Sequence, residues 1–117
     1  MIKNPTIFIQ HILGSLDLIE YFMNNVTKAA FLNNEEKQSA VIRQIEIIGE
    51  AVKNLPQPFK EKYIEIPWED IAGMRDKLMH HYFGVNLETV WQVVKKDLPV
   101  LKRKISSVKD SLEKDID

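Results

Sequence analysis

One stretch in the middle of the chain gathers the side chains best suited to proton transfer and phosphate binding. Residues 74–84 read Met-Arg-Asp-Lys-Leu-Met-His-His-Tyr-Phe-Gly. Histidine titrates near neutral pH and is the commonest general acid or base. Arginine keeps its charge and matches phosphate oxygens with a planar fork of donors. This stretch is therefore the first candidate for a catalytic site.

The spacing of these residues suggests a reaction. On one continuous helix, Arg75 and His80 would lie about 140° apart in projection and about 7.5 Å apart along the axis, so two long side chains could converge on a groove. His80 could then exchange the proton of a ribose 2′-hydroxyl while Arg75 stabilises the more negative phosphorus of the transition state. Asp76, about 40° from His80, could orient the imidazole. These residue types favour metal-free cleavage of RNA, although an arginine and a histidine on a helix are more often structural.

Metal binding is a weaker interpretation. His80 and His81 are adjacent, so their side chains would point about 100° apart, unlike the one-turn spacing of helical zinc ligands. Glu46 and Glu50 share a face of an earlier helix. They could form a metal pair, partner a buried arginine, or be solvated surface residues. We predict neither a metal nor a cofactor.

Apolar residues at helical spacing predict the elements that position this stretch. Asn4 followed by Pro5 suits the start of a first helix, and Asn33 with Glu36 resembles a capping box at the start of a second. The core stripe of the first helix is expected at Phe8, Ile12, Leu16, Ile19, Met23 and Val26, and is widened by Ile9, Leu13 and Phe22.

The second half of the chain continues the helical pattern. A third long helix is expected from Pro67 to Gly84, and a fourth after Asn86, which Pro99 ends or kinks. No strand signal, repeat or linker is visible. The prediction is an all-α, up-and-down bundle of four to five helices, with residues 1–117 forming a single domain.

Composition narrows the function classes. The chain has 117 residues, a formal net charge of -1 and no cysteine. A near-neutral chain is a poor candidate for coating nucleic acid, so an RNA contact must come from a local patch. The lysine-rich second half offers one, although a solvated face is the more ordinary interpretation. No apolar run approaches the roughly 20 residues of a membrane span, and we predict a cytoplasmic protein without a membrane partner.

The whole chain resembles the HepT-like branch of the HEPN superfamily, a set of small all-helical prokaryotic proteins. The resemblance is strongest in four co-linear blocks, at residues 41–51, 66–75, 80–85 and 87–98. The signature of that family is an arginine, four residues, a histidine, any residue and a tyrosine. Arg75, His80 and Tyr82 match it here.

The resemblance implies a metal-independent ribonuclease toxin that acts as a homodimer, with the arginine and histidine lining a cleft between protomers. It also implies a partner, the minimal nucleotidyltransferase antitoxin of HepT/MntA toxin–antitoxin pairs, which transfers AMP onto the motif tyrosine. By position that tyrosine is Tyr82. An AMP group there would place bulk and negative charge where it competes with the RNA phosphate.

Two residues depart from the family pattern. Asp76 and His81 stand where the family often has Asn and Asp, and His81 is a second possible base beside His80. Two other interpretations stay open. The chain could be a non-catalytic helical subunit that binds substrate for, or stabilises, a nucleotidyltransferase, or it could be a purely structural dimer.

Overall fold

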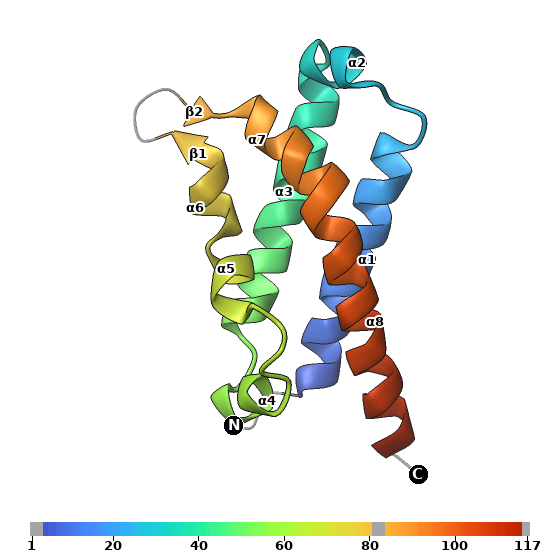
Figure 1. Ribbon diagram of the computed structural model, residues 1–117, viewed down its shortest axis with the longest axis vertical. Coiled ribbons are helices and arrows are strands. Elements are labelled where there is room, and N and C mark those ends of the chain that lie inside the picture. The colour runs from blue at the N-terminus through green and yellow to red at the C-terminus, as the bar shows by residue number, and fades with distance from the viewer. Residues whose placement is uncertain (1–3, 81–83, 116–117) are drawn as a thin grey trace.

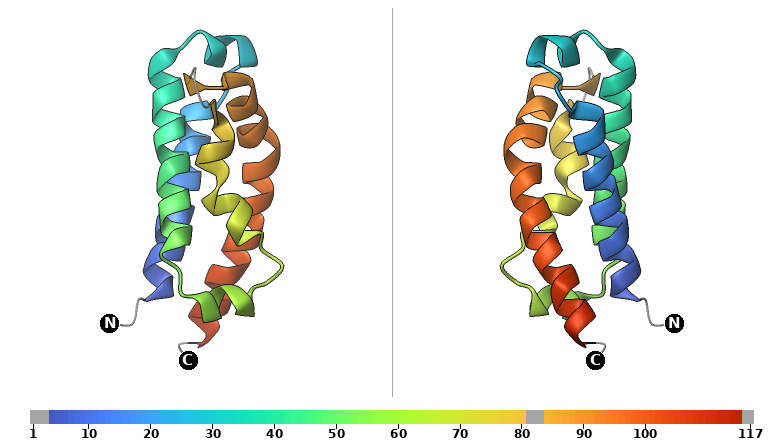
Figure 2. Two further views of the ribbon diagram at one scale, coloured as in Figure 1. Left: turned by 90° about the vertical axis from the view of Figure 1, so that its left-hand side faces the viewer. Right: turned by 90° about the vertical axis from the view of Figure 1, so that its right-hand side faces the viewer.

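The described residues, 4–80 and 84–115, are almost entirely helical in this computed structural model. In chain order the elements are α1 (Pro5–Met23), α2 (Lys28–Leu32), α3 (Glu35–Lys53), α4 (Gln57–Lys62), α5 (Trp68–Ala72), α6 (Met74–Leu78), β1 (Met79–His80), β2 (Gly84–Val85), α7 (Leu87–Gln92), the π-helical turn η1 (Val93–Asp97) and α8 (Leu98–Asp115). They form four segments that alternate in direction: α1, then α3, then α5 with α6, then α7 through α8 (Figures 1 and 2). The prediction of an all-α, up-and-down bundle is confirmed.

Asparagine side chains cap the helix starts. Asn4 and Asn86 cap α1 and α7 as predicted, since their side-chain oxygens accept backbone N–H groups of the first turn at 3.0 and 3.1 Å. The predicted start of α3 at Asn33 is one residue early. Asn34 is the cap, accepting the N–H of Lys37 at 2.9 Å, while Asn33 ends α2. Either asparagine could cap a helix, and the preceding short helix decides between them.

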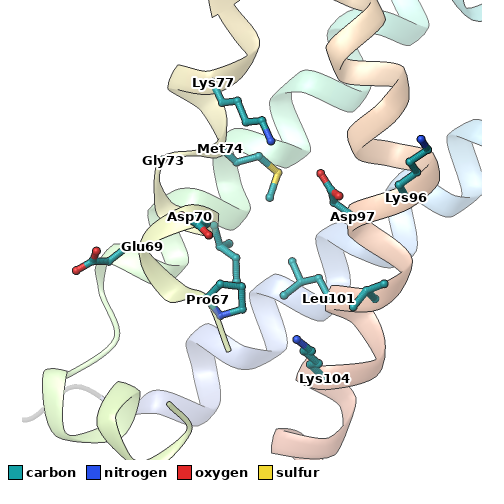
Figure 3. Close-up of a pocket in the computed structure, with 12 residues that line it drawn as sticks. Pro67, Glu69, Asp70, Gly73, Met74, Lys77, Lys96, Asp97, Leu101 and Lys104 are labelled. Carbon is teal, nitrogen blue, oxygen red and sulfur yellow. The ribbon is translucent and has the colours of Figure 1, made fainter. Parts of the chain in front are cut away.

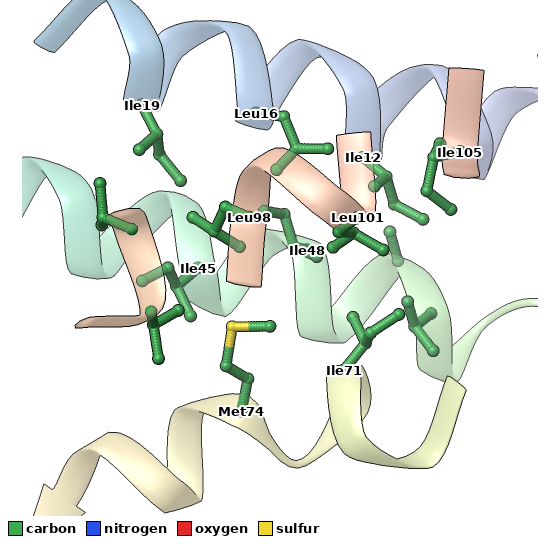
Figure 4. Packing of buried hydrophobic residues seen from close by; sticks show 14 of the residues in the cluster. Ile12, Leu16, Ile19, Ile45, Ile48, Ile71, Met74, Leu98, Leu101 and Ile105 are labelled. Atoms are coloured by element: carbon green, nitrogen blue, oxygen red, sulfur yellow. The ribbon is translucent and has the colours of Figure 1, made fainter. Parts of the chain in front are cut away.

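The core lies between α1, α3, α8 and the α5–α6 segment (Figure 4). The predicted stripe of α1 is confirmed at four positions, but Ile9 starts it, and Phe8 is only partly buried. In the described ranges no helix is long and apolar enough to cross a membrane. The side chains labelled in Figure 4 are Ile12, Leu16, Ile19, Ile45, Ile48, Ile71, Met74, Leu98, Leu101 and Ile105.

The predicted continuous third helix from Pro67 to Gly84 is wrong at two places. At Gly73 the backbone leaves helical geometry, with φ -88° and ψ 2°, and this residue separates α5 from α6. Glycine has a low helix propensity and few steric limits on its backbone angles, so a helix is readily interrupted at this residue. Further along, α6 ends at Leu78, six residues before the predicted glycine cap.

A short antiparallel hairpin replaces the end of that helix. The carbonyl of Leu78 accepts the N–H of Asn86 at 2.9 Å, a bond that a continuing helix would exclude. Met79 then pairs with Val85, and His80 pairs with Gly84. The helical projection angles predicted between Arg75 and His80 therefore do not apply, because no single helix contains both residues.

Pro99 does not end the fourth segment. Proline lacks an N–H, and its ring clashes with the carbonyl four residues back, so an ordinary turn is unfavourable there. The turn η1 widens instead, and the N–H of Leu98 donates to the carbonyl of Val93, five residues earlier. The segment thus runs from Leu87 to Asp115 without a break in helical structure.

Candidate active site

Arg75 of α6 is joined to α3 by a charge-assisted hydrogen bond. Its Nε donates to Oε2 of Glu46 at 2.8 Å. Their side chains are 51% and 29% exposed. Of the interpretations left open for Glu46, partnering the arginine is the one observed, although that arginine is half exposed rather than buried.

The charges around Arg75 stabilise its protonated form. The hydrogen bond that Arg75 donates to Glu46, and then the charge of Glu46, raise the pKa of Arg75 above its ordinary value, and the charges of Asp76 and Glu50 add smaller effects. Nη1 lies 3.7 Å from Oδ1 of Asp76. Within the described residues Nη2 makes no hydrogen bond. Arg75 is therefore a fixed cation with part of its donor fork open to a ligand.

A shallow pocket of about 360 Å³ surrounds this guanidinium. Glu50 and Asp76 are exposed, and Glu50 pairs with Lys53 at 3.6 Å rather than with the arginine. Arg43 and Lys53, two cations that were not predicted as site residues, also line the pocket. The full lining is Arg43, Glu46, Gly49, Glu50, Lys53, Ala72, Arg75 and Asp76. The structure thus brings together four of the predicted site residues, which are Glu46, Glu50, Arg75 and Asp76.

Gly49 allows α5 to approach α3 at this pocket. A Cβ atom built on Gly49 would lie 3.3 Å from the carbonyl oxygen of Ala72. This close approach fixes the start of α6 near Glu46, which lies almost one turn before Gly49 on α3. Gly49 escaped the sequence analysis. The sequence feature that could have indicated this role is a glycine inside an apolar helical run. A glycine there weakens the helix, so its presence indicates a close neighbouring backbone.

Replacing Gly49 with valine is expected to lower the free energy of unfolding by about 1–3 kcal/mol, because the added atoms force α5 away from α3. Valine has a higher helix propensity than glycine, so the substitution by itself should stabilise α3. A loss of stability would therefore come from the clash with α5. Urea unfolding followed by circular dichroism measures the change. The matched control is Gly14→Val in α1, whose Cβ would meet nothing within 4 Å and which should not lower the stability. A Gly49→Val variant as stable as wild type would contradict the role assigned to this glycine.

The remaining predicted residues lie at the hairpin. The backbone of His80 is in β1, two residues beyond the end of α6. The side chain of His80, and all of His81 and Tyr82, lie outside the described residues. The proposed pairing of an imidazole with the guanidinium of Arg75 therefore stays a prediction.

A larger pocket of about 590 Å³ lies on the other side of α6, between the α5–α6 segment and the η1–α8 segment (Figure 3). Ile71, Met74 and Leu101 supply apolar walls. Of the lysine-rich second half, Lys96 and Lys104 line this pocket. None of the predicted catalytic residues does, so size alone does not identify the reactive site.

Other lysines of that half have partners within the chain. Lys102 pairs with Asp17 and Glu20 of α1 at 3.1 and 2.9 Å. Its pKa is raised, first by the hydrogen bond to Glu20 and then by that to Asp17. Lys95 lies over the Trp91 ring at 4.8 Å. These contacts favour the solvated-face interpretation over a continuous phosphate-binding patch.

The described side chains form no cluster that could hold a metal ion. In residues 4–80 and 84–115, no group of three or more histidine, aspartate or glutamate side chains is arranged to hold a metal ion. What the Arg75 pocket offers for a phosphate is a cation that Glu46 holds in place, with Arg43 and Lys53 in the same lining.

Comparison with known proteins identifies relatives over most of the chain. A "Gamma-glutamylcyclotransferase and putative RNase" of Methanocaldococcus jannaschii is 50% identical over 114 residues, 97% of this chain and 51% of that protein. This chain thus spans about half the length of that relative. "Probable ribonuclease HepT" of Thermococcus cleftensis is 45% identical over 102 residues, 87% of this chain and 93% of the relative. A "Putative RNase" of Caldanaerobacter subterraneus is 40% identical over 106 residues, 91% and 95% of the two chains.

The fold and the Arg75 pocket define a small, almost entirely helical protein with a half-exposed arginine held by a carboxylate. The family model described as "Ribonuclease HepT-like" matches residues 12–108, which include at least part of each of the four segments. The chain belongs to the HepT-like ribonuclease family. No solved structure gives a significant match.

Proposed function

We propose that the chain is the ribonuclease toxin of a toxin–antitoxin pair and cleaves RNA in the cytoplasm without a metal ion. The observation that supports this most is Arg75, which lines a pocket, is held through Nε by Glu46, and has no hydrogen bond at Nη2 to any side chain that the structure describes. In the proposed reaction Arg75 binds the scissile phosphate and stabilises its transition-state charge. His80 accepts the proton of the 2′-hydroxyl as the 2′-oxygen attacks the phosphorus. The bond from phosphorus to the 5′-oxygen then breaks, and that oxygen leaves with a proton from the imidazolium or from water. Asp76 and His81 support the imidazole.

The proposed enzyme is a homodimer of one HEPN domain per chain, spanning residues 1–117. The arginines and histidines of two copies would line one cleft at their contact. The half-exposed state of Arg75 supports such an arrangement, since its guanidinium is accessible to a second subunit and to RNA. Glu46 and Glu50 would stay on the wall of that cleft, limiting where a phosphate can approach.

The test of the proposed reaction is an RNA cleavage assay in EDTA. The purified wild-type chain is expected to cleave RNA, because none of the proposed steps uses a metal. The alternative function is a non-catalytic subunit that binds substrate or partner for a nucleotidyltransferase. A wild-type chain that never cleaves RNA but binds a nucleotidyltransferase tightly would establish that alternative and exclude the nuclease.

The proposed partner is a minimal nucleotidyltransferase antitoxin that transfers AMP from ATP to Tyr82. The hydroxyl oxygen of the tyrosine attacks the α-phosphorus of ATP, pyrophosphate leaves, and the hydroxyl proton passes to solvent or a base. Tyr82 is seven residues from Arg75 in the chain. The added phosphodiester would compete with RNA for the arginine.

Co-expression with the nucleotidyltransferase is expected to raise the mass of the wild-type chain by one or more AMP units. Tyr82→Phe removes the hydroxyl that accepts AMP and should abolish the increase. Intact-protein mass spectrometry measures it, and Tyr21→Phe is the matched control, because Tyr21 is 78% exposed and lies on α1. A Tyr82→Phe chain that still gains the full mass would rule out Tyr82 as acceptor.

A further inference from the structure

Arg43 is a second arginine at the Arg75 pocket, and the proposed reaction gives it no role. Its side chain lines the pocket together with Glu46 and Arg75. Arg43 lies three residues before Glu46 on α3, so the two side chains share one face of that helix. The carboxylate of Glu46, however, is bonded to Arg75. Among the residues that the structure describes, none forms an ion pair or a side-chain hydrogen bond with the exposed Arg43, so its donor fork is free for a ligand.

The register between α3 and α6 shows where Arg43 stands along the pocket. The two helices lie side by side and run in opposite directions, and the bond between Glu46 and Arg75 fixes their register (Figure 1). A step of three residues from this pair toward the hairpin, about 4.5 Å, reaches Arg43 on α3 and Leu78 on α6. Leu78 ends α6, and the backbone of His80 follows two residues later in β1. Arg43 thus stands on the side of Arg75 that leads to His80.

We propose that Arg43 binds a backbone phosphate of the RNA, next to the phosphate that Arg75 holds. This inference rests on the proposed function, because it takes RNA as the ligand. A single strand with one phosphate at Arg75 that continues toward the hairpin passes Arg43. The guanidinium offers a planar fork of donors that fits phosphate oxygens. The net charge of the chain is only -1, so its affinity for RNA must come from cations placed along the path of the strand.

The two arginines are expected to contribute to different kinetic constants. Arg75 is held by Glu46 at 2.8 Å, so its donors are in place before charge develops in the transition state. No described side chain holds Arg43, so it follows the phosphate and binds substrate and transition state equally well. Uniform binding of this kind lowers KM and leaves kcat unchanged. Arg43 therefore sets the affinity for RNA rather than the rate of cleavage.

Lys53 provides a matched control, because it is also on α3 and lines the same pocket. It lies seven residues after Glu46, which is about 10.5 Å along the helix and away from the hairpin. Its ammonium pairs with Glu50 at 3.6 Å, which offsets its charge. Lys53→Ala therefore removes one positive charge from the pocket at a place that the proposed path of the RNA does not reach.

Binding of an RNA that resists cleavage tests Arg43 without requiring catalysis. A fluorescent 2′-O-methyl oligonucleotide lacks the attacking hydroxyl and keeps the phosphates. Arg43→Ala should raise its Kd about fivefold at about 0.1 M salt and reduce the slope of log Kd against log salt by about 0.7, the contribution of one phosphate contact on a single strand. Arg43→Lys keeps the charge and should restore most of the slope. Lys53→Ala should stay within about twofold of wild type.

Steady-state cleavage in EDTA gives a second readout. Arg43→Ala is expected to raise KM about fivefold and to keep kcat within about twofold of wild type, the pattern of lost uniform binding. Circular dichroism and light scattering should show the same helix content and the same mass for every variant. A loss of affinity together with a lower mass would overturn the proposal, because Arg43 would then act in a contact between subunits.

The outcomes separate this inference from the proposed nuclease. An Arg43→Ala variant with the Kd and salt slope of wild type would overturn the assignment of Arg43, and so would a wild-type chain that binds no RNA. A wild-type chain that binds the oligonucleotide through Arg43 but cleaves no RNA would support the phosphate contact and exclude the nuclease. Cleavage that is unaffected by Arg43→Ala, at every RNA concentration, would exclude the contact and leave the nuclease standing.

Discussion

Replacing Arg75 with alanine is expected to lower kcat for RNA cleavage by about 100- to 1000-fold, the effect of removing one donor that stabilises transition-state charge. Arg75 is the cation that the structure positions at the pocket, through the 2.8 Å bond to Glu46. Without it the phosphate loses the planar donor fork that stabilises its charge. Cleavage of a fluorescent RNA in EDTA under single-turnover conditions measures the change.

His80→Ala should produce a loss of similar size, since the proposed reaction needs both groups in one step. Lys77→Ala is the matched control, because Lys77 is also on α6 but lines the larger pocket on its other side. That variant should keep activity within a few-fold of wild type. Thermal unfolding shows whether each variant is folded. Folded Arg75→Ala and His80→Ala variants with full activity would eliminate the assignment of the reaction to this pocket.

Replacing Ile48 with alanine is expected to lower the free energy of unfolding by about 2–5 kcal/mol, the combined cost of lost burial and of the cavity left behind. Ile48 is fully buried on α3, at the centre of the core (Figure 4). For a small domain that loss is a large fraction of total stability. Urea unfolding at equilibrium measures it.

The control for Ile48→Ala is Ile64→Ala, which removes the same atoms from a side chain that is 80% exposed. Its effect should stay within about 0.5 kcal/mol. If both variants unfold at the same urea concentration as wild type, the packing around α3 differs from the arrangement described. A loss confined to Ile48→Ala would support it.

The helices themselves could be predicted because their causes are local. Apolar spacing on α1 and asparagine caps at Asn4 and Asn86 depend on neighbouring residues. The end of the third segment could not be predicted in this way. Leu78 is followed by residues that suit a helix, and what competes with the helix is the N–H of Asn86, eight residues away, together with two strand pairs.

The site shows the same division between local and long-range causes. The residue types at Arg75 and His80 indicate phosphate chemistry without a structure. The role of Glu46 could be stated only as one of three possibilities, because the arginine that it pairs with is 29 residues away in the chain. Gly49 was missed for the same reason, since the carbonyl it makes room for belongs to Ala72 on another helix.

An even number of alternating segments returns the chain to the end of the bundle where it began. Pro5 and Asp115 therefore lie at the end opposite the β1–β2 hairpin (Figure 1). The 18 residues of α8 alone span about 27 Å of that length. An affinity tag, a fluorophore or a surface linkage attached at either terminus would accordingly leave the hairpin end open to macromolecular ligands.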